Sequence, residues 1–162
     1  MGSTLRKTAL FVALVSALLL GGAFAFQHFG GLAPCPLCVW QRYPHGVTIA
    51  AALLAYLIPV TFLQRGFLGI AGLALLAGAA IAAFHVGVEQ KWWEGLPSCA
   101  GGADIGKMSI EDLKKNVTNA GPRCDEVAWQ LFGISMAGYN FIISALVGLG
   151  ALFVASRRRK RK

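Results

Sequence analysis

Four long stretches without a charged side chain constrain this chain more than any other feature. They cover residues 8–26, 46–63, 66–88 and 128–156, and each holds 18 to 29 residues. A helix of about 20 apolar residues crosses the hydrocarbon core of a bilayer. Inside lipid the backbone must satisfy its own hydrogen bonds, which favours helix despite the many glycines. The sequence therefore predicts an all-α membrane protein, a transmembrane bundle of four helices.

The composition excludes several other classes of protein. Apolar residues make up 56% of the 162 residues and charged residues 14%, whereas globular domains average about 25% charged residues. This excess of apolar residues excludes disorder, collagen and coiled coil. The net charge of +8 would by itself suggest a nucleic-acid partner. Its distribution along the chain gives a different explanation.

The charges separate into basic and acidic segments. The N-terminal segment, the short turn around Arg65 and the run 157–162 carry +9 and no acidic residue. The segments 27–45 and 89–127 together carry −1 and include all seven acidic residues. The positive-inside rule places the basic segments, with both termini, in the cytoplasm, and segments 27–45 and 89–127 become two outer loops. The basic run is then a topology anchor that contacts membrane lipid, and no nucleic-acid partner is expected.

The first apolar stretch has a competing interpretation. Arg6 and Lys7, the apolar run and the small residues Ala23 and Ala25 resemble a cleavable signal peptide. Cleavage would leave three spans in the same orientation. We favour a retained span, because the apolar run is longer than a usual signal sequence and continues past Ala25.

All four cysteines lie in the predicted outer loops, which indicates disulfide chemistry in an oxidising compartment. Cys35 and Cys38 form a C-x-x-C motif, typical of labile redox pairs, and the prolines around it suit the start of a helix. Cys99 and Cys124 bracket 24 residues, which on its own favours a stabilising disulfide. A zinc site would need a second close pair of ligands, so no metal is expected.

Three basic side chains are candidates for the same site. Arg42 and His45 follow Cys38 at helical spacing, so they share one face with the C-x-x-C motif, although Pro44 interrupts the pattern. An arginine there could stabilise a thiolate and hold an anionic or quinonoid oxygen, whereas a lone interfacial arginine is more often an anchor. His85, near the outer end of the third stretch, is a candidate proton donor to an acceptor near Cys38.

Longer motifs carry a resemblance to a known family. The segment 35–44, CPLCVWQRYP, resembles the C-x-x-C-plus-arginine signature of the disulfide bond formation protein B (DsbB) family. The segment 84–89, FHVGVE, ahead of Cys99 resembles a later part of that family, as do Cys124 and the segment 132–138, FGISMAG. The resemblance covers nearly the whole chain.

The resemblance implies a fold and an activity. It implies a bundle of four helices with two periplasmic loops in the bacterial inner membrane. It also implies a quinone-dependent protein-disulfide oxidoreductase that reoxidises a periplasmic thioredoxin-like partner of the DsbA type and passes electrons to ubiquinone or menaquinone.

The resemblance also implies roles for individual residues. Cys99, paired with Cys124, would take up the mixed disulfide with the partner. Cys124 and Cys35 would exchange, and Cys38 would face the quinone. Arg42 would help bind the quinone, and His45 and His85 remain candidate cofactor-binding residues without a transferred role.

Two other functions stay open on the sequence alone. One is a reductase of the vitamin K epoxide type, although there the C-x-x-C motif lies near the end of the bundle. The other is a membrane scaffold of four spans with purely structural disulfides.

Overall fold

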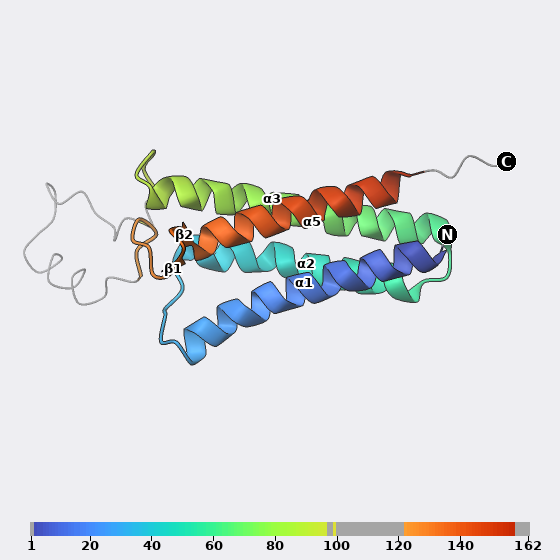
Figure 1. Cartoon of the computed structure of the whole chain (residues 1–162), viewed down its shortest axis with the longest axis horizontal. Helices are drawn as coiled ribbons and strands as arrows, with labels where there is room; N and C mark the ends of the chain where they lie inside the picture. Colours follow the sequence, from blue (N-terminus) through green and yellow to red (C-terminus); the bar gives the residue numbers. More distant parts are fainter. Residues whose placement is uncertain (1, 97–98, 100–121, 158–162) are drawn as a thin grey trace, which may run out of the picture.

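The computed structural model describes residues 2–96, 99 and 122–157. Parts of the predicted loop 89–127 and of the basic run 157–162 lie outside the described residues. The helices run side by side, and the start of the first and the end of the last lie at the same end (Figure 1). They are α1 (Gly2–His28), α2 (Pro36–Leu57), α3 (Thr61–Glu89) and α5 (Met136–Ser156).

The helices agree with the predicted all-α architecture. Among the described residues, α1, α3 and α5 are long and apolar enough to cross a membrane, while α2 falls outside this set. Large apolar side chains cover the outside of the bundle, as lipid contact requires. Examples are Phe11 and Leu18 in α1, Leu73 in α3 and Leu146 in α5, all of which are exposed.

The second helix differs in its bounds from the predicted stretch 46–63. It begins ten residues earlier, at Pro36, and ends at Leu57. Pro59, in the short connection to α3, cannot continue a helix, and its ring restricts the residue before it. Because α3 begins at Thr61, Arg65, expected in the turn between two spans, lies inside α3.

The last helix is also shorter than the predicted stretch 128–156. Residues Gln130–Leu131 (β1) and Ile134–Ser135 (β2) pair antiparallel ahead of it. The two residues between these strands both have positive φ, 50° at Phe132 and 77° at Gly133, as a type I′ hairpin turn requires. Ser135 then caps α5, because its Oγ accepts a hydrogen bond of 3.1 Å from the Gly138 N–H.

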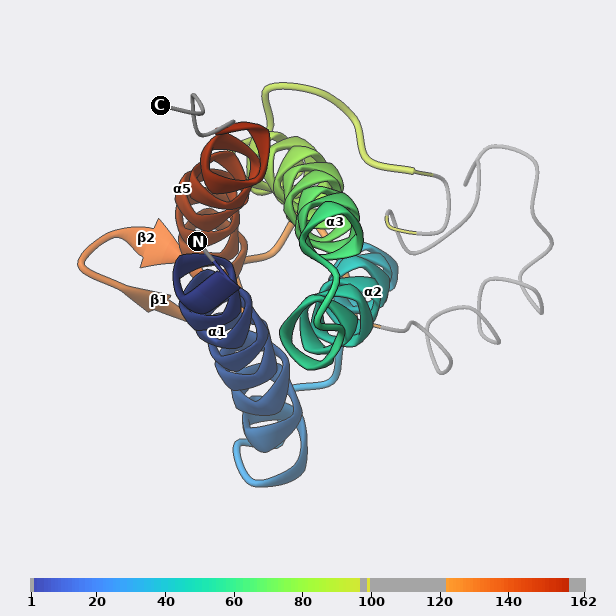
Figure 2. The same cartoon turned by 90° about the vertical axis from the view of Figure 1, so that its right-hand side faces the viewer.

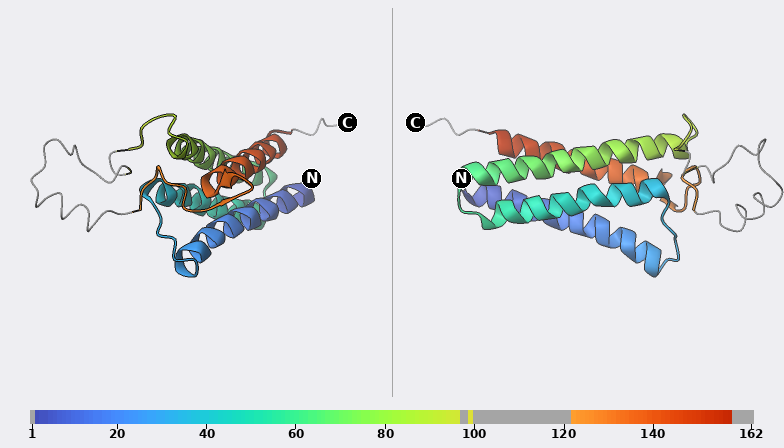
Figure 3. Two further views of the ribbon diagram at one scale, coloured as in Figure 1. Left: turned by 60° about the vertical axis from the view of Figure 1, so that its left-hand side comes forward. Right: turned by 180° about the vertical axis from the view of Figure 1, so that it is seen from behind.

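Close packing holds the helices together. α3 packs against both α5 and α2, and α1 packs mainly against α2 (Figure 2). Gly72 in α3 and Gly148 in α5 face each other, and a Cβ atom at either one would lie 3.0 Å from the carbonyl oxygen of the other. Small residues at such crossings let helices approach closely in a membrane. Toward its C-terminal end α1 diverges from the other helices (Figure 3).

Candidate active site: the cysteine cluster

The four cysteines meet in one buried cluster at the hairpin end of the bundle. Cys35, Cys99 and Cys124 are each at most 3% exposed, and Cys38 packs against them. Leu37 and Val88 complete the apolar surroundings. Two pairs of cysteines more than 60 residues apart in the sequence are thus brought into contact range.

The two pairs differ in state. Cys99 and Cys124 form a disulfide with a Cα–Cα distance of 5.0 Å. Cys35 and Cys38 are free thiols whose sulfur atoms lie 2.6 Å apart, so a disulfide can form there without rearrangement of the backbone. The pair that the sequence favoured as structural is therefore the oxidised one, and it lies beside the C-x-x-C motif.

Local structure positions the C-x-x-C motif at the start of α2. Cys35 is the N-cap residue, its Sγ accepts a hydrogen bond of 3.1 Å from the Cys38 N–H, and Pro36 occupies the first turn. Cys38 therefore lies in the first helical turn, where the helix dipole favours a thiolate. The hydrogen bond with the Cys38 side chain, together with burial, raises the pKa of the Cys35 thiol. Cys35 is thus the protonated member of the pair.

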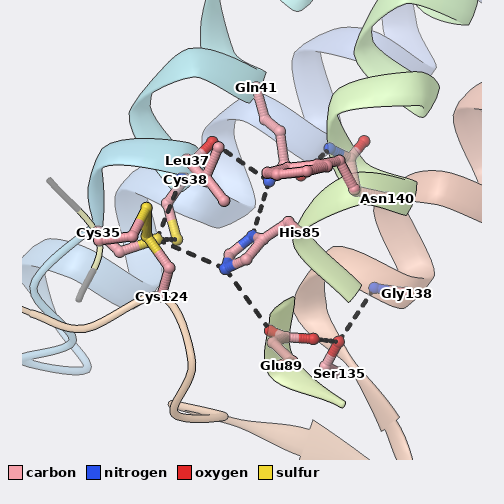
Figure 4. A network of polar contacts seen from close by, with 12 residues as sticks. Cys35, Leu37, Cys38, Gln41, His85, Glu89, Cys124, Ser135, Gly138 and Asn140 are labelled. Atoms are coloured by element: carbon pink, nitrogen blue, oxygen red, sulfur yellow. Dashed lines mark hydrogen bonds and ion pairs between the residues drawn. A yellow bond between two sulfur atoms is a disulfide. The ribbon is translucent and has the colours of Figure 1, made fainter. Parts of the chain in front are cut away.

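His85 in α3 contacts this pair directly. Its Nε2 lies 3.6 Å from Cys35 Sγ and 3.9 Å from Glu89 Oε1, and its Nδ1 lies 2.9 Å from Gln41 Nε2 (Figure 4). Glu89 Oε2 in turn accepts a hydrogen bond of 2.5 Å from Ser135 Oγ. The hairpin and α3 are thereby joined next to the cysteines.

Arg42, in α2, packs against α1. One terminal nitrogen donates a hydrogen bond of 2.7 Å to Gln27 Oε1, and the guanidinium carbon lies 4.6 Å from the centre of the Phe24 ring. Its Nε is buried without a hydrogen-bond partner among the described residues. Arg42 also lines a cavity of about 410 Å³, together with Cys35 and Cys38 and with residues of α1, α3 and α5.

The structure brings the seven predicted site residues to one end of the bundle, at two depths. The four cysteines, Arg42 and His85 lie together, whereas His45 lies deeper, between Ser16 of α1 and Asn140 of α5. Gln41 and Glu89, which contact His85, are not among the site residues predicted from the sequence. The available signal was polarity: Gln41 is a buried amide in an apolar helix.

A helical membrane protein with two cysteine pairs in one cluster belongs to the class of dithiol–disulfide proteins.

Comparison with known proteins identifies the family. A family profile described as disulfide bond formation protein DsbB matches residues 5–154. The chain is 34% identical to disulfide bond formation protein B of Chromohalobacter salexigens, over 98% of this chain and 96% of that protein. It is 32% identical to the Stutzerimonas stutzeri protein of the same name, over 91% and 94% of the two chains. No solved structure matches significantly. The chain belongs to the DsbB family.

Proposed function

We propose that this protein is a membrane thiol oxidase that reoxidises a periplasmic thioredoxin-like dithiol protein of the DsbA type. Electrons then pass through the two cysteine pairs to a membrane quinone, ubiquinone or menaquinone. The observation that carries the proposal is the contact of both pairs in one cluster beside the cavity. Two purely structural disulfides would have no need to share that position.

The electron path follows thiol–disulfide exchange. A partner thiolate attacks Cys99, breaks its bond to Cys124 and forms a mixed disulfide between the partner and Cys99. The second partner thiolate then attacks the partner sulfur of this mixed disulfide, which forms the partner's own disulfide and leaves Cys99 and Cys124 reduced. Cys124 attacks Cys35 of an oxidised C-x-x-C motif and expels Cys38 as a thiolate. Cys99 then attacks Cys124, re-forms their disulfide and leaves Cys35 and Cys38 reduced. Each exchange moves one electron pair and changes no overall oxidation state.

The cavity beside the C-x-x-C motif suits a quinone ring. Its volume is typical of small-molecule sites, and α1 lines one side of it with apolar residues such as Leu18, Ala23 and Phe26. The Arg42 guanidinium, which lines the cavity with Cys38, supplies a charged donor for a carbonyl oxygen. A bound quinone supplies a two-electron, two-proton acceptor. Cys38 and Arg42 would hold it, and α1 would exclude water.

The proposal includes a position in the inner membrane. The cysteine cluster lies at the end of the bundle opposite the start of α1 and the end of α5 (Figure 1). With the basic segments in the cytoplasm, that end faces the periplasm, where the partner is found. α2 then crosses the membrane as the fourth span, and its polar first half lies at the outer surface.

The test combines purified protein with a reduced thioredoxin-like partner and a short-chain quinone. We expect quinone absorbance to fall as partner thiols disappear, two thiols for each quinone. Cys38→Ser and Cys124→Ser should each abolish this turnover. A scaffold would show no quinone consumption, and that result would refute the proposal. Consumption of partner thiols with a quinone epoxide, and not with the quinone, would instead indicate a reductase of the vitamin K epoxide type.

A further inference from the structure

A line of buried polar side chains runs from the cysteine cluster into the middle of the bundle. His85 Nδ1 lies 2.9 Å from Gln41 Nε2, and Gln41 Oε1 lies 2.7 Å from Asn140 Nδ2 (Figure 4). Asn140 Oδ1 lies 3.0 Å from His45 Nε2, and His45 Nδ1 lies 3.2 Å from Ser16 Oγ. The line joins α1, α2, α3 and α5 and ends at Cys35, which contacts His85. We call it the polar chain.

The positions of its hydrogens follow from the partner atoms. Gln41 Nε2 also donates a hydrogen bond of 3.2 Å to the Leu37 carbonyl oxygen, which can only accept. The Gln41 amide is therefore fixed with its nitrogen toward His85 and its oxygen toward Asn140. As a result, His85 Nδ1 accepts a hydrogen from Gln41, and Gln41 Oε1 accepts one from Asn140.

The hydrogen bonds of Asn140, His45 and Ser16 are donated in the same direction along the polar chain. Asn140 Oδ1 accepts hydrogen bonds from His45 Nε2 and, at 2.9 Å, from Ser144 Oγ. In a neutral His45 ring, Nδ1 then accepts from Ser16 Oγ. Every donor along the line therefore points toward the cysteines. All five side chains donate their hydrogen bonds in one direction, so every group in the network has a partner, and such a network is specific.

The direction of these hydrogen bonds determines the tautomer of His85, that is, which ring nitrogen carries the hydrogen. Because its Nδ1 accepts, a neutral His85 ring carries its hydrogen on Nε2, the atom that faces Cys35 Sγ at 3.6 Å. The same cluster has the composition of a metal site, since ligand atoms of Cys35, Cys38 and His85 lie within 4.8 Å of one another. A metal would need the lone pair of Nε2, which the polar chain leaves protonated. The polar chain thus makes His85 Nε2 a hydrogen-bond donor rather than a metal ligand.

We propose that the polar chain holds His85 as a donor to Cys35, with His85 a catalytic residue of thiol exchange and Gln41, Asn140 and His45 positioning residues. The catalytic part rests on the proposed function. When Cys99 attacks Cys124 in the Cys35–Cys124 mixed disulfide, a Cys99–Cys124 bond forms and the bond to Cys35 breaks. The electron pair goes to Cys35, which leaves as a thiolate. The His85 Nε2–H stabilises that thiolate, and its proton stays on the ring.

The protonated nitrogen can be observed directly. Full-length protein in detergent, labelled with ¹⁵N-histidine, should show His85 protonated at Nε2, with His85→Phe used to assign the signal. Gln41→Glu should move the proton to Nδ1, because a carboxylate only accepts. The same variant should gain affinity for Cd²⁺ in the reduced state, and Gln41→Glu/His85→Ala should lose that gain. A wild-type ring protonated at Nδ1, or a Gln41→Glu ring that is unchanged, would overturn the proposal.

The catalytic role requires a kinetic test. In the Cys38→Ser background, the Cys35–Cys124 disulfide can be trapped and its intramolecular resolution by Cys99 followed over pH. We expect His85→Phe and Asn140→Leu to slow the release of Cys35 at least about tenfold, as the loss of a hydrogen bond to a charged group would. Thr48→Val is the matched control, because Thr48 makes a buried contact between α2 and α3 outside the polar chain. Equal rates in His85→Phe and wild type would overturn the catalytic role.

These tests separate the two proposals. The spectra of the histidine ring need neither partner nor quinone. A ring protonated at Nε2 in a protein that consumes no quinone would refute the oxidase and leave the polar chain in place.

Discussion

At the scale of single residues, the two thiols of the C-x-x-C motif are chemically unequal although they lie three positions apart. The Cys38 side chain and burial raise the pKa of Cys35, which therefore stays protonated near neutral pH. Cys38 is only partly buried and borders the cavity. We expect an uncharged alkylating reagent to modify Cys38 well before Cys35 in the reduced protein. Mass spectrometry of peptides at successive times measures this order, and faster modification of Cys35 would contradict it.

Arg42 provides a second prediction at this scale. Arg42→Lys removes the planar guanidinium and its fork of donors while keeping the charge. We expect the KM for a short-chain quinone to rise at least about tenfold, because a hydrogen bond to a charged group contributes about 1.5–3 kcal/mol. Arg65→Lys, the same substitution at the opposite end of the bundle, is the control and should leave this KM unchanged. Equal KM values in Arg42→Lys and wild type would exclude Arg42 from quinone binding.

The sequence could predict some site residues and not others for a physical reason. Spacing within one helix was enough to place Arg42 near Cys38. Glu89 lies four residues after His85 on the same helix, but Gln41 lies on α2, so its contact with His85 depends on how the two helices are rotated about their axes. Gln41 and Asn140 look like isolated polar residues in the sequence, and only the packed bundle shows that one amide donates to the other.

At the scale of helices and strands, charge counting found the elements but misplaced their ends. A run without charges does not distinguish a helix from a hairpin, so the stretch 128–156 concealed the turn at Phe132 and Gly133. The first ten residues of α2 include the charged Arg42 and other polar residues, so they lay outside the uncharged stretch 46–63. Proline, glycine and capping residues set the boundaries, and they act within a few positions of each end.

The contact between α3 and α5 predicts the effect of a single added side chain. In Gly148→Leu the new Cβ would lie 3.0 Å from the Gly72 carbonyl oxygen and 3.1 Å from Leu75 Cβ. Both helices must then shift, so we expect a loss of about 1–3 kcal/mol in the free energy of unfolding. Thermal unfolding in one detergent measures the loss. Gly150→Leu is the control, because a Cβ there meets nothing within 4 Å, and an equal loss in both variants would contradict the close approach.

At the scale of the whole molecule, the basic segments that hold no acidic residue and the cysteine cluster lie at opposite ends. Arg6 and Arg65 lie near the start of α1 and the start of α3, which meet at one end of the bundle (Figure 1). The cysteine cluster lies at the other end. Positive segments stay in the cytoplasm during insertion, so the separation predicts which end faces the oxidising compartment. Among the described helices, α2 falls outside the set apolar enough to cross a membrane, and its first half is polar.

Alkaline phosphatase fusions test this orientation, because the enzyme is active only outside the cytoplasm, where its disulfides form. We expect activity for a fusion after Gly31 and none after Val60 or Ser156, with equal amounts of fusion protein confirmed by immunoblot. The pair Gly31 and Val60 brackets α2, so activity after both would show that α2 does not cross. Activity after Ser156 would place the end of α5 outside. The cysteine cluster, at the opposite end of the bundle, would then face the cytoplasm, where thiols are kept reduced and no periplasmic partner could reach Cys99.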